Sequence, residues 1–509
     1  MAKLSKSKLT MAAHCNRKLW LSSHNPNVAK KDAHMELIAK RGTEFGDYCR
    51  ALFPGGILVD IRNSELAAQH TRELLAAMTA STAKPLYEAA FIYNEVVVRV
   101  DIMVPIQTVD GALVWKLIEI KSGRSRTDKG EFKEKYTLDA AIQHFVVTHN
   151  NIPIIETMLG TPDSLFILTV PGVYEGVLRT ERINEAIEPI LPSIPALINM
   201  ARPLVDSSPE PIVAIDSHCS GCEYINHCTN TVLHENEDFR VPTWFLASSP
   251  HSKIVQSALP ISRNLADIPE SLLIEPIHRA MRRVARNEFD TYIHPDLTAF
   301  LNGEPTVRWF LDFEFLGSAL PLWTGTSPNE SIPFQFSLHK SIGLNFERIT
   351  HSEFLGDTSE DPRPRLISAL VHAYDESGPI YTWHGKQTEG PILDKLANMA
   401  VGRERKVLQE MANNCKRDDL LPHFKNWFYA LGMQNWSLKQ VAKHYLDQDP
   451  YIILETQNGL DAMRDYEELL RTEDSIQRSE IRANLLAYCK LDTQVMIDIW
   501  KKISNPALN

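Results

Sequence analysis

The chain has 509 residues, of which 44% are hydrophobic and 23% are charged, and its formal net charge at pH 7 is −11. This length allows two or three domains with hydrophobic cores, and the negative balance argues against a protein that coats nucleic acid through bulk charge. No stretch of signal-peptide or membrane-spanning character stands out, and the seven cysteines are scattered. We therefore expect a cytoplasmic protein without a membrane partner, whose cysteines are thiols or metal ligands rather than disulfides.

The first half of the chain predicts an α/β domain. Three consecutive β-prone runs are separated by polar or glycine turns, which is typical of antiparallel strands. Helical segments flank these runs, and a short apolar run follows them. The expected elements are a helix at 36–53, strands at 86–93, 95–105 and 113–123, a helix at 131–149 and a buried strand at 164–170. Helix, three strands, helix and strand is the core order of restriction-endonuclease-like folds.

Acidic residues on these strands form a candidate metal site. Side chains alternate faces along a strand, so Glu119 and Lys121 point the same way, and Asp101 on the neighbouring strand is close enough to share a cation with Glu119. Carboxylates suit Mg²⁺ or Mn²⁺, which activates a water at a scissile phosphate, and Lys121 would orient that water or stabilise the charge that develops. Glu88 is a further candidate ligand, and Gln143 is a candidate contact to water or to the DNA backbone. The alternative is a surface hairpin that carries a Glu/Lys pair.

Four cysteines bracket this domain. Cys219, Cys222 and Cys228 follow it in HCSGCEYINHC, and Cys15 precedes it. Cys219-x-x-Cys222 alone would indicate zinc or two buried thiols, whereas four soft ligands together suit an iron–sulfur cluster. The remaining cysteines lack such spacing and are interpreted as buried thiols: Cys49, Cys415 and Cys489.

Residues 1–235 resemble the iron–sulfur branch of the RecB nuclease family, which includes the CRISPR-associated exonucleases and the AddB helicase–nuclease subunit. The resemblance rests on VRVDIMVP, LVWKLIEIKSG and the cysteine spacing. It implies a PD-(D/E)XK nuclease with Asp101, Glu119, Lys121 and Gln143 as its catalytic set. It also implies a [4Fe–4S] cluster on Cys15, Cys219, Cys222 and Cys228. The chain departs from that pattern at Gly46, where many relatives have a metal-binding His, and at Val147, where many have Tyr.

The second half of the chain begins with a connector and continues as another α/β domain. Residues 230–305 are rich in Pro and Ser, with a helical piece of their own. Strands first and helices later favour a mixed sheet flanked by helices. The expected elements are strands at 307–315, 334–340 and 349–355, a helix at 364–376, a strand at 379–383 and several C-terminal helices.

A second acidic constellation lies in this domain. FLDFEF places Asp312 and Glu314 on one face of a strand, and AYCKLDTQV places Tyr488 and Asp492 one helical turn apart near the start of the last long helix. Two exposed carboxylates and a core tyrosine are the alternative. Together the motifs resemble the tyrosine subclass of DEDD exonucleases, of the DnaQ and ribonuclease-H-like superfamily. The resemblance implies two bound metal ions and a Tyr that positions the attacking water.

The middle acid of that pattern is less regular in this chain. Glu389 stands after a strand, at the opening of a helix, where the family has Asp, and Asp394 one turn later is a weaker candidate. Asp419 is expected to support the site. The predicted metal ligands of the two sites are therefore Glu88, Asp101, Glu119, Asp312, Glu314, Glu389 and Asp492.

The whole arrangement resembles an uncharacterised bacterial family that fuses an iron–sulfur RecB-like module to a DEDD-like domain. The predicted fold class is α/β, with a nuclease module at 1–235, a helical connector at 236–304 and a ribonuclease-H-like domain at 305–509. The predicted function is a metal-dependent nuclease that trims nucleic-acid ends, more readily DNA than RNA. A nucleic-acid-binding scaffold with one or both sites degenerate is the alternative.

Basic residues follow the Glu119-x-Lys121 motif and could carry a nucleic-acid track, although a solvated surface is the simpler interpretation of one such run. They are Arg124, Arg126, Lys129, Lys133 and Lys135.

Overall fold

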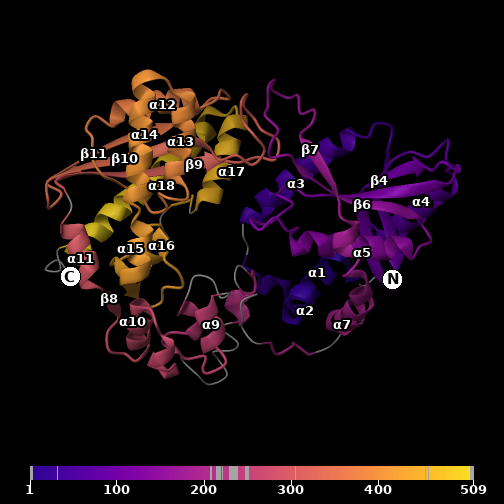
Figure 1. Cartoon of the computed structure of the whole chain (residues 1–509), viewed down its shortest axis with the longest axis horizontal. Coiled ribbons are helices and arrows are strands. Elements are labelled where there is room, and N and C mark those ends of the chain that lie inside the picture. The colour runs from indigo at the N-terminus through magenta and orange to yellow at the C-terminus, as the bar shows by residue number, and fades with distance from the viewer. Residues whose placement is uncertain are drawn as a thin grey trace. The chain divides into compact units, whose positions relative to one another are not determined.

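A computed structural model describes residues 4–30, 33–206, 209–213, 219, 222–228, 239–246, 252–303, 305–452, 454–456 and 458–504. The chain forms two compact units (Figure 1). The first comprises Met1–Ile215, Cys222–Cys228 and Ser318–Glu330, and the second comprises Asp216–Gly221, Thr229–Gly317 and Ser331–Asn509. The predicted boundary at 235 lies outside the described residues.

The first unit is built on a mixed sheet of seven strands in the order β2-β3-β4-β5-β6-β7, with β1 also paired to β4. β3, β4 and β5 are antiparallel, and β6 is parallel to β5. The three predicted central strands are therefore confirmed. The strands are β1 (Leu4–Ser5), β2 (Ile57–Leu58), β3 (Leu86–Tyr93), β4 (Val96–Gln107), β5 (Leu113–Ile120), β6 (Ile154–Pro162) and β7 (Leu178–Arg182).

Helices pack on this sheet through their apolar residues. The buried side chains of α5, including Ala140, Phe145 and Val147, pack in one core with side chains of β3, β4 and β5. Phe45 and Cys49 of α3 pack in a second cluster with Ile102 and Ile118. The helices are α1 (Lys6–His14), α2 (Asn16–His24), α3 (Ala33–Ala51), α4 (Ser64–Ala76), α5 (Glu134–Thr148), α6 (Asn184–Ile187) and α7 (Ile194–Asp206).

The predicted strand at 164–170 is wrong. The strand that pairs with β5 is β6, which follows α5 directly and ends at Pro162. In the apolar run SLFILTV only Leu168 is fully buried, whereas Leu165 is 80% exposed. Leu168 exchanges backbone hydrogen bonds with Gly325 and Thr326 of the chain between β9 and β10, at 2.7 and 3.0 Å. Leu168 is therefore held by pairing with an irregular segment distant in sequence and not by the sheet.

β1 and β5 approach the same stretch of β4 from opposite directions. β1 is parallel to β4, with Ser5 opposite Val97, whereas β5 is antiparallel, with Ile118 opposite Ile102. β3 occupies the other edge of β4. The chain that leaves β1 therefore arrives beside the end of β5, at the part of β4 that leads into Asp101.

The second unit contains a four-stranded sheet in the order β11-β10-β9-β12, with β12 parallel to β9 and the other pairs antiparallel. A separate pair joins β8 and β13, so the predicted connector contributes a strand as well as helices. The strands are β8 (Thr291–Ile293), β9 (Val307–Leu316), β10 (Ile332–Ile342), β11 (Arg348–Leu355), β12 (Ile380–Tyr381) and β13 (Phe428–Ala430).

The two faces of β9 pack against different helices. Trp309, Leu311 and Phe313 pack into a core with α12, α13 and α14. Because side chains alternate along a strand, Asp312 and Glu314 point to the other face, over which α18 packs. The helices are α9 (Lys253–Ala258), α10 (Pro276–Ala285), α11 (Pro295–Asn302), α12 (Arg363–Ala373), α13 (Glu389–Met399), α14 (Gly402–Arg417), α15 (Leu420–Trp427), α16 (Leu438–Tyr445), α17 (Gly459–Arg471) and α18 (Ser475–Ser504).

Short 3₁₀ helices cover Pro26–Val28, Leu191–Ser193, Thr243–Leu246, Leu265–Asp267 and Glu270–Leu272. Within the described ranges, no helix combines the length and the apolar character needed to cross a bilayer.

Candidate metal centres in the two units

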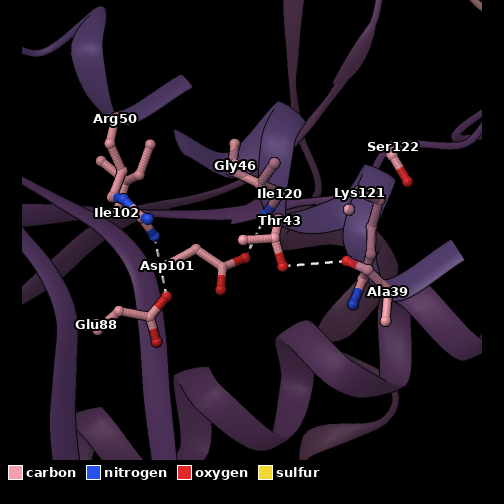
Figure 2. A pocket seen from close by; sticks show the side chains of 11 residues that line it. Ala39, Thr43, Gly46, Arg50, Glu88, Asp101, Ile102, Ile120, Lys121 and Ser122 are labelled. Carbon is pink, nitrogen blue, oxygen red and sulfur yellow. Dashed lines mark hydrogen bonds and ion pairs between the residues drawn. The ribbon is translucent and has the colours of Figure 1, made fainter. Parts of the chain in front are cut away.

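Asp101 lies in the wall of a pocket of about 350 Å³ in the first unit (Figure 2). Its Oδ2 accepts a hydrogen bond of 2.7 Å from the backbone N–H of Ile120, which fixes the carboxyl group across the β4–β5 pair. Lys121 and Glu88 also line the pocket. Burial and then the charge of Glu119 raise the pKa of Asp101 to about 7, so this carboxyl needs a cation in order to stay ionised at neutral pH.

Glu119 stands beside this pocket and is only 2% exposed. Its Oε1 receives the ammonium groups of both Lys6 and Lys121 at 2.7 Å, and its Oε2 accepts a hydrogen bond from Gln143. Burial alone would raise the pKa of Glu119, but the two lysines outweigh it and lower the pKa to about 2. The structure thus brings Glu119, Lys121 and Gln143 together as predicted, and adds Lys6, which local sequence patterns do not single out.

Lys121 is held between two carboxylates. Besides Glu119, its Nζ contacts Asp139 Oδ2 on α5 at 2.7 Å. Burial would lower the pKa of Lys121, but Glu119 and Asp139 raise it well above its usual range. Asp139 lies four residues before Gln143, so both face β5 from one side of α5. Gln143 Nε2 also donates to the carbonyl of Arg99 at 3.0 Å.

Glu88 enters the pocket through an unusual backbone conformation. Its φ is +54°, in the left-handed region that few residues other than glycine adopt, and it interrupts the regular β3–β4 pairing opposite Asp101. Arg50 of α3 contacts its Oε1 at 3.4 Å. Burial raises the pKa of Glu88 although Arg50 opposes this shift. This strained placement beside Asp101 fits a ligand role better than a structural one.

The two departures from the RecB pattern occupy different surroundings. Gly46 lines the pocket, and a Cβ built there would meet nothing within 4 Å, so the pocket has room at the position where the resemblance predicts a histidine. Val147 is fully buried among apolar neighbours. Its side chain is therefore part of the hydrophobic core.

The segment with the later cysteines packs against α2. Cys228 and Tyr224 lie in one hydrophobic cluster with Leu21, and Glu223 forms an ion pair of 2.8 Å with Lys18. Cys15 lies at the junction of α1 and α2. Burial raises the pKa of the Cys222 thiol, and Cys15 adds to this effect. Cys15, Cys222 and Cys228 are thus drawn to one region, and Cys219 is described without its immediate neighbours. No disulfide joins any of the seven cysteines, all of which are described.

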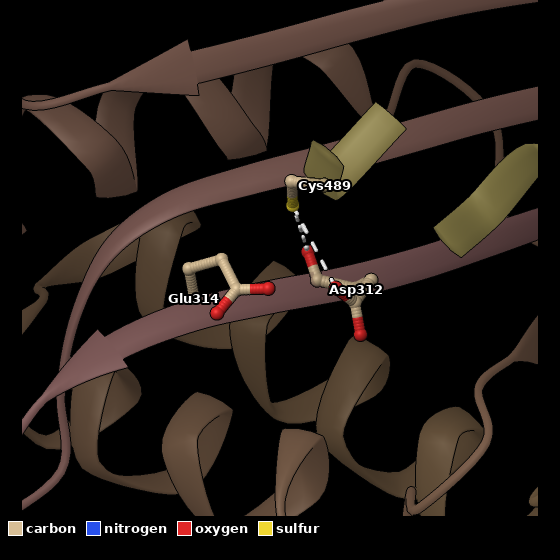
Figure 3. Close-up of side chains that lie close together, drawn as sticks. All are labelled: Asp312, Glu314 and Cys489. Atoms are coloured by element: carbon tan, nitrogen blue, oxygen red, sulfur yellow. Dashed lines mark hydrogen bonds between the residues drawn. The ribbon is translucent and has the colours of Figure 1, made fainter. Parts of the chain in front are cut away.

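The second site combines β9 with α18 (Figure 3). Asp312, Glu314 and Cys489 offer ligand atoms that all lie within 4.8 Å of one another, the one such group of three among the described residues. The thiol of Cys489 lies 3.7 Å from Asp312 Oδ2. Cys489 is buried, as predicted, but it packs directly against a carboxylate of the site.

Tyr488 and Asp492 reach the same site from α18. They lie in the middle of this helix, which begins at Ser475, so their predicted place near its start is wrong. Asp492 accepts a hydrogen bond of 2.5 Å from Tyr451, and Lys439 of α16 donates to the hydroxyl of Tyr488 at 2.9 Å. The sequence patterns did not indicate Tyr451 or Lys439, although Lys439 belongs to an amphipathic run that could have drawn attention to α16.

Glu389 begins α13 and is 4% exposed, and its Oε2 has no hydrogen-bond partner. Burial raises its pKa to about 8. The weaker candidate, Asp394, forms an ion pair with Lys416 instead. Asp419 caps α15 and accepts a hydrogen bond of 3.1 Å from the backbone of Lys386, so it supports the turn that leads to Glu389.

The acids of the second site repel one another. Burial and then the charges of Asp492 and Glu314 raise the pKa of Asp312 well above its usual range, and Glu389 adds to this effect. Burial and Asp492 likewise raise the pKa of Glu314. Clustered hard oxygen donors with this much unbalanced charge fit a divalent cation such as Mg²⁺ or Mn²⁺.

A family model described as "Domain of unknown function (DUF2779)" matches residues 309–437. The match begins on β9 and includes Asp312, Glu314 and Glu389, but it ends before Tyr488 and Asp492. The comparison with curated proteins found no match to this chain.

Proposed function

We propose that this protein is a metal-dependent nuclease that degrades or trims nucleic-acid ends, with DNA preferred over RNA as its substrate. The observation that carries the proposal is the second site, where Asp312 and Glu314 of β9 cluster with Cys489 of α18 and feel the charges of Asp492 and Glu389. Carboxylates that repel one another and lack enough cations of their own are expensive to maintain. They are therefore more consistent with a metal site than with packing.

In the second unit, Asp312, Glu314, Asp492 and Glu389 would hold Mg²⁺ or Mn²⁺. These ions would supply charge neutralisation at the scissile phosphate and activation of the attacking water. Tyr488 would orient that water through its hydroxyl, which Lys439 holds in place. The strand order β11-β10-β9-β12, with β12 parallel to β9, is compatible with a ribonuclease-H-like fold and so supports the DEDD interpretation.

In the first unit, Asp101, Glu119 and Glu88 would hold Mg²⁺ or Mn²⁺, and Lys121 would stabilise charge on the phosphate or its attacking water. The sequence of three antiparallel strands, α5 and the parallel strand β6 is compatible with a PD-(D/E)XK core.

Cys15, Cys219, Cys222 and Cys228 would hold the [4Fe–4S] cluster of the first unit. Soft thiolates are the ligands that such clusters use, and the packing of 222–228 on α2 supports the grouping. We expect anaerobically purified protein to contain iron and acid-labile sulfide, and Cys222→Ser to abolish both. Cys415→Ala serves as the control that keeps the iron, and iron-free wild-type protein would refute the cluster.

A nucleic-acid-binding protein without cleavage is the second candidate. It is favoured by one observation on the first site: Glu119, a required ligand, is already neutralised by Lys6 and Lys121. On this interpretation the first unit would bind nucleic acid without the ability to cleave it.

The deciding experiment compares wild type, Asp101→Asn, Asp312→Asn and the double variant on 3′- and 5′-labelled single-stranded DNA and RNA with Mn²⁺. We expect stepwise shortening by wild type and a drop of at least about 10³-fold in the double variant, because removal of metal-site charge stabilisation costs several kcal/mol. The single variants assign the activity to a unit. Cleavage unchanged in the double variant would refute both sites, and tight binding without cleavage by wild type would favour the second candidate.

A further inference from the structure

α1 carries two polar side chains, one turn apart, that reach into the first site. Lys6 Nζ contacts Glu119 Oε1 at 2.7 Å, across 113 residues of sequence. Thr10 donates a hydrogen bond of 2.9 Å to Asp139 Oδ1, across 129 residues. Positions i and i+4 share one face of a helix, so a single face of α1 makes both contacts.

Both contacts converge on Lys121. Glu119 and Asp139 are the two carboxylates that hold its ammonium group, each at 2.7 Å. Lys6 binds the first carboxylate and Thr10 binds the second. The order of contacts is therefore Lys6, Glu119, Lys121, Asp139 and Thr10, a chain that begins and ends on α1.

The placement of α1 is set by pairing and packing. β1 ends directly before Lys6, and its parallel pairing with β4 brings the chain to the end of β5. Leu4, Leu9 and Ala12 are buried in the same core as α5. The apolar side of the helix thus fixes where its polar side points.

The contacts from α1 give each carboxylate that holds Lys121 a further donor. Without α1, Glu119 would keep only Lys121 and Gln143 as donors, and Asp139 would lose the donor that Thr10 provides. A buried carboxylate without sufficient donors draws the nearest cation toward it. Because α1 gives Glu119 and Asp139 a donor each, Lys121 can remain between them. Lys121, which lines the pocket together with Asp101, is then held in one place.

We propose that α1 is part of the first active site, and that Lys6 and Thr10 are positioning residues that act on Lys121 through Glu119 and Asp139. The inference rests on the proposed nuclease function of the first unit. It makes the N-terminal segment a component of the catalytic centre as well as of the core.

The test uses the full chain with Asp312→Asn, so that only the first site can cleave. Lys6→Gln and Thr10→Val remove the contacts, Thr10→Ser restores the hydroxyl, and Ser7→Ala changes an exposed residue on the same turn of α1. We expect kcat on labelled single-stranded DNA to fall about 10–100-fold in the first two variants with KM within about 2-fold, because small misplacement of a catalytic group has effects of this size. Thr10→Ser should recover most of kcat, and Ser7→Ala should match its parent.

Two further measurements separate positioning from folding. Tm, and affinity for the same DNA in Ca²⁺ by fluorescence anisotropy, should stay within a few degrees and about 2-fold of the parent. Unchanged kcat in Lys6→Gln and Thr10→Val, or a Thr10→Ser variant no better than Thr10→Val, would overturn the inference while the nuclease function stands. A parent with Asp312→Asn that cleaves nothing would instead remove the function of the first site, and this inference with it.

Discussion

The two candidate sites differ in how they balance the charge of their carboxylates. In the first, Lys6 and Lys121 neutralise Glu119, and Arg50 contacts Glu88. The carboxyl of Asp101 is held differently, because it accepts a hydrogen bond from a backbone N–H. Glu119 therefore keeps its charge with no bound ion, whereas the raised pKa of Asp101 leaves that carboxyl only partly ionised without one.

In the second site, the charges of Asp492, Glu314 and Asp312 all act on Lys439. Lys439 lowers the pKa of Asp492 and of Glu314, and burial lowers its own pKa despite these acids. Protons must then replace the missing positive charge when no metal is bound. Similar sets of carboxylates thus differ in how far side-chain cations balance their charge, and we expect the second site to depend more strongly on a bound cation.

The largest expected consequence is a difference in metal-dependent stability. Ligand binding to the native state alone adds about 2.7 kcal/mol at 100 times Kd, so about 1 mM Mn²⁺ should raise the calorimetric Tm of EDTA-treated protein by several degrees. Most of this rise should disappear in Asp312→Asn, because that carboxylate lies at the centre of the second site. Asp101→Asn is the matched variant and should keep it. An equal rise in both variants would contradict the comparison.

The pH dependence of stability in the metal-free protein tests the charge balance of the second site. The folded-state pKa of Glu389 is about 8, above its ordinary value of 4.5, so the native state binds more protons than the unfolded state between these values. The contribution of Glu389 is thus fully favourable below about 4.5 and is lost as pH rises toward 8. In EDTA, the free energy of unfolding should fall over this window, and Glu389→Gln should flatten the fall. A slope identical to that of wild type would show that Glu389 does not titrate there.

The empty space beside Gly46 offers a gain-of-function test of the first site. Gly46→His would place an imidazole in the pocket wall, and histidine favours a helix more than glycine does. We expect Mn²⁺ affinity at this site to rise about tenfold, or about 1.4 kcal/mol, when measured by electron paramagnetic resonance with Asp312→Asn. Gly46→Leu fills the same space without a ligand and should not tighten binding. Equal affinity in both variants would place the metal elsewhere.

The smallest effect on nucleic-acid binding is expected from the basic residues at the start of α5. The ammonium groups of Lys133 and Lys135 lie 5.5 and 5.1 Å from the ring of Tyr136, whereas Arg126 is paired with Glu181 at 2.9 Å. Burial lowers the pKa of Lys133, and the positive charges of Lys135 and Arg124 lower it further. Replacing both lysines by Ala should reduce the salt slope of single-stranded DNA binding by about 0.7 for each phosphate that is no longer neutralised. Arg126→Ala should leave it nearly unchanged, and the reverse result would assign the phosphate contact to Arg126.

Local patterns predicted the elements that carry the acids. The alternation in 86–123 yields β3, β4 and β5, and the spacing of Asp312 and Glu314 puts both on the face of β9 away from the apolar core. The same reasoning failed at 164–170, because an apolar run in a loop packed against a distant segment has the composition of a strand. A short apolar run therefore specifies neither a strand nor burial, since most of this run is exposed.

The central strands of the first sheet and the paired carboxylates could be predicted from the sequence, because each depends on residues a few positions apart. Which cations meet those carboxylates could not be predicted, because it depends on the tertiary fold. Lys6 reaches Glu119 because β1 and β5 end at the same stretch of β4, and Lys439 reaches Tyr488 because α16 packs on α18. Such contacts join residues tens to more than a hundred positions apart. They are set by strand register and helix packing, for which no local pattern exists.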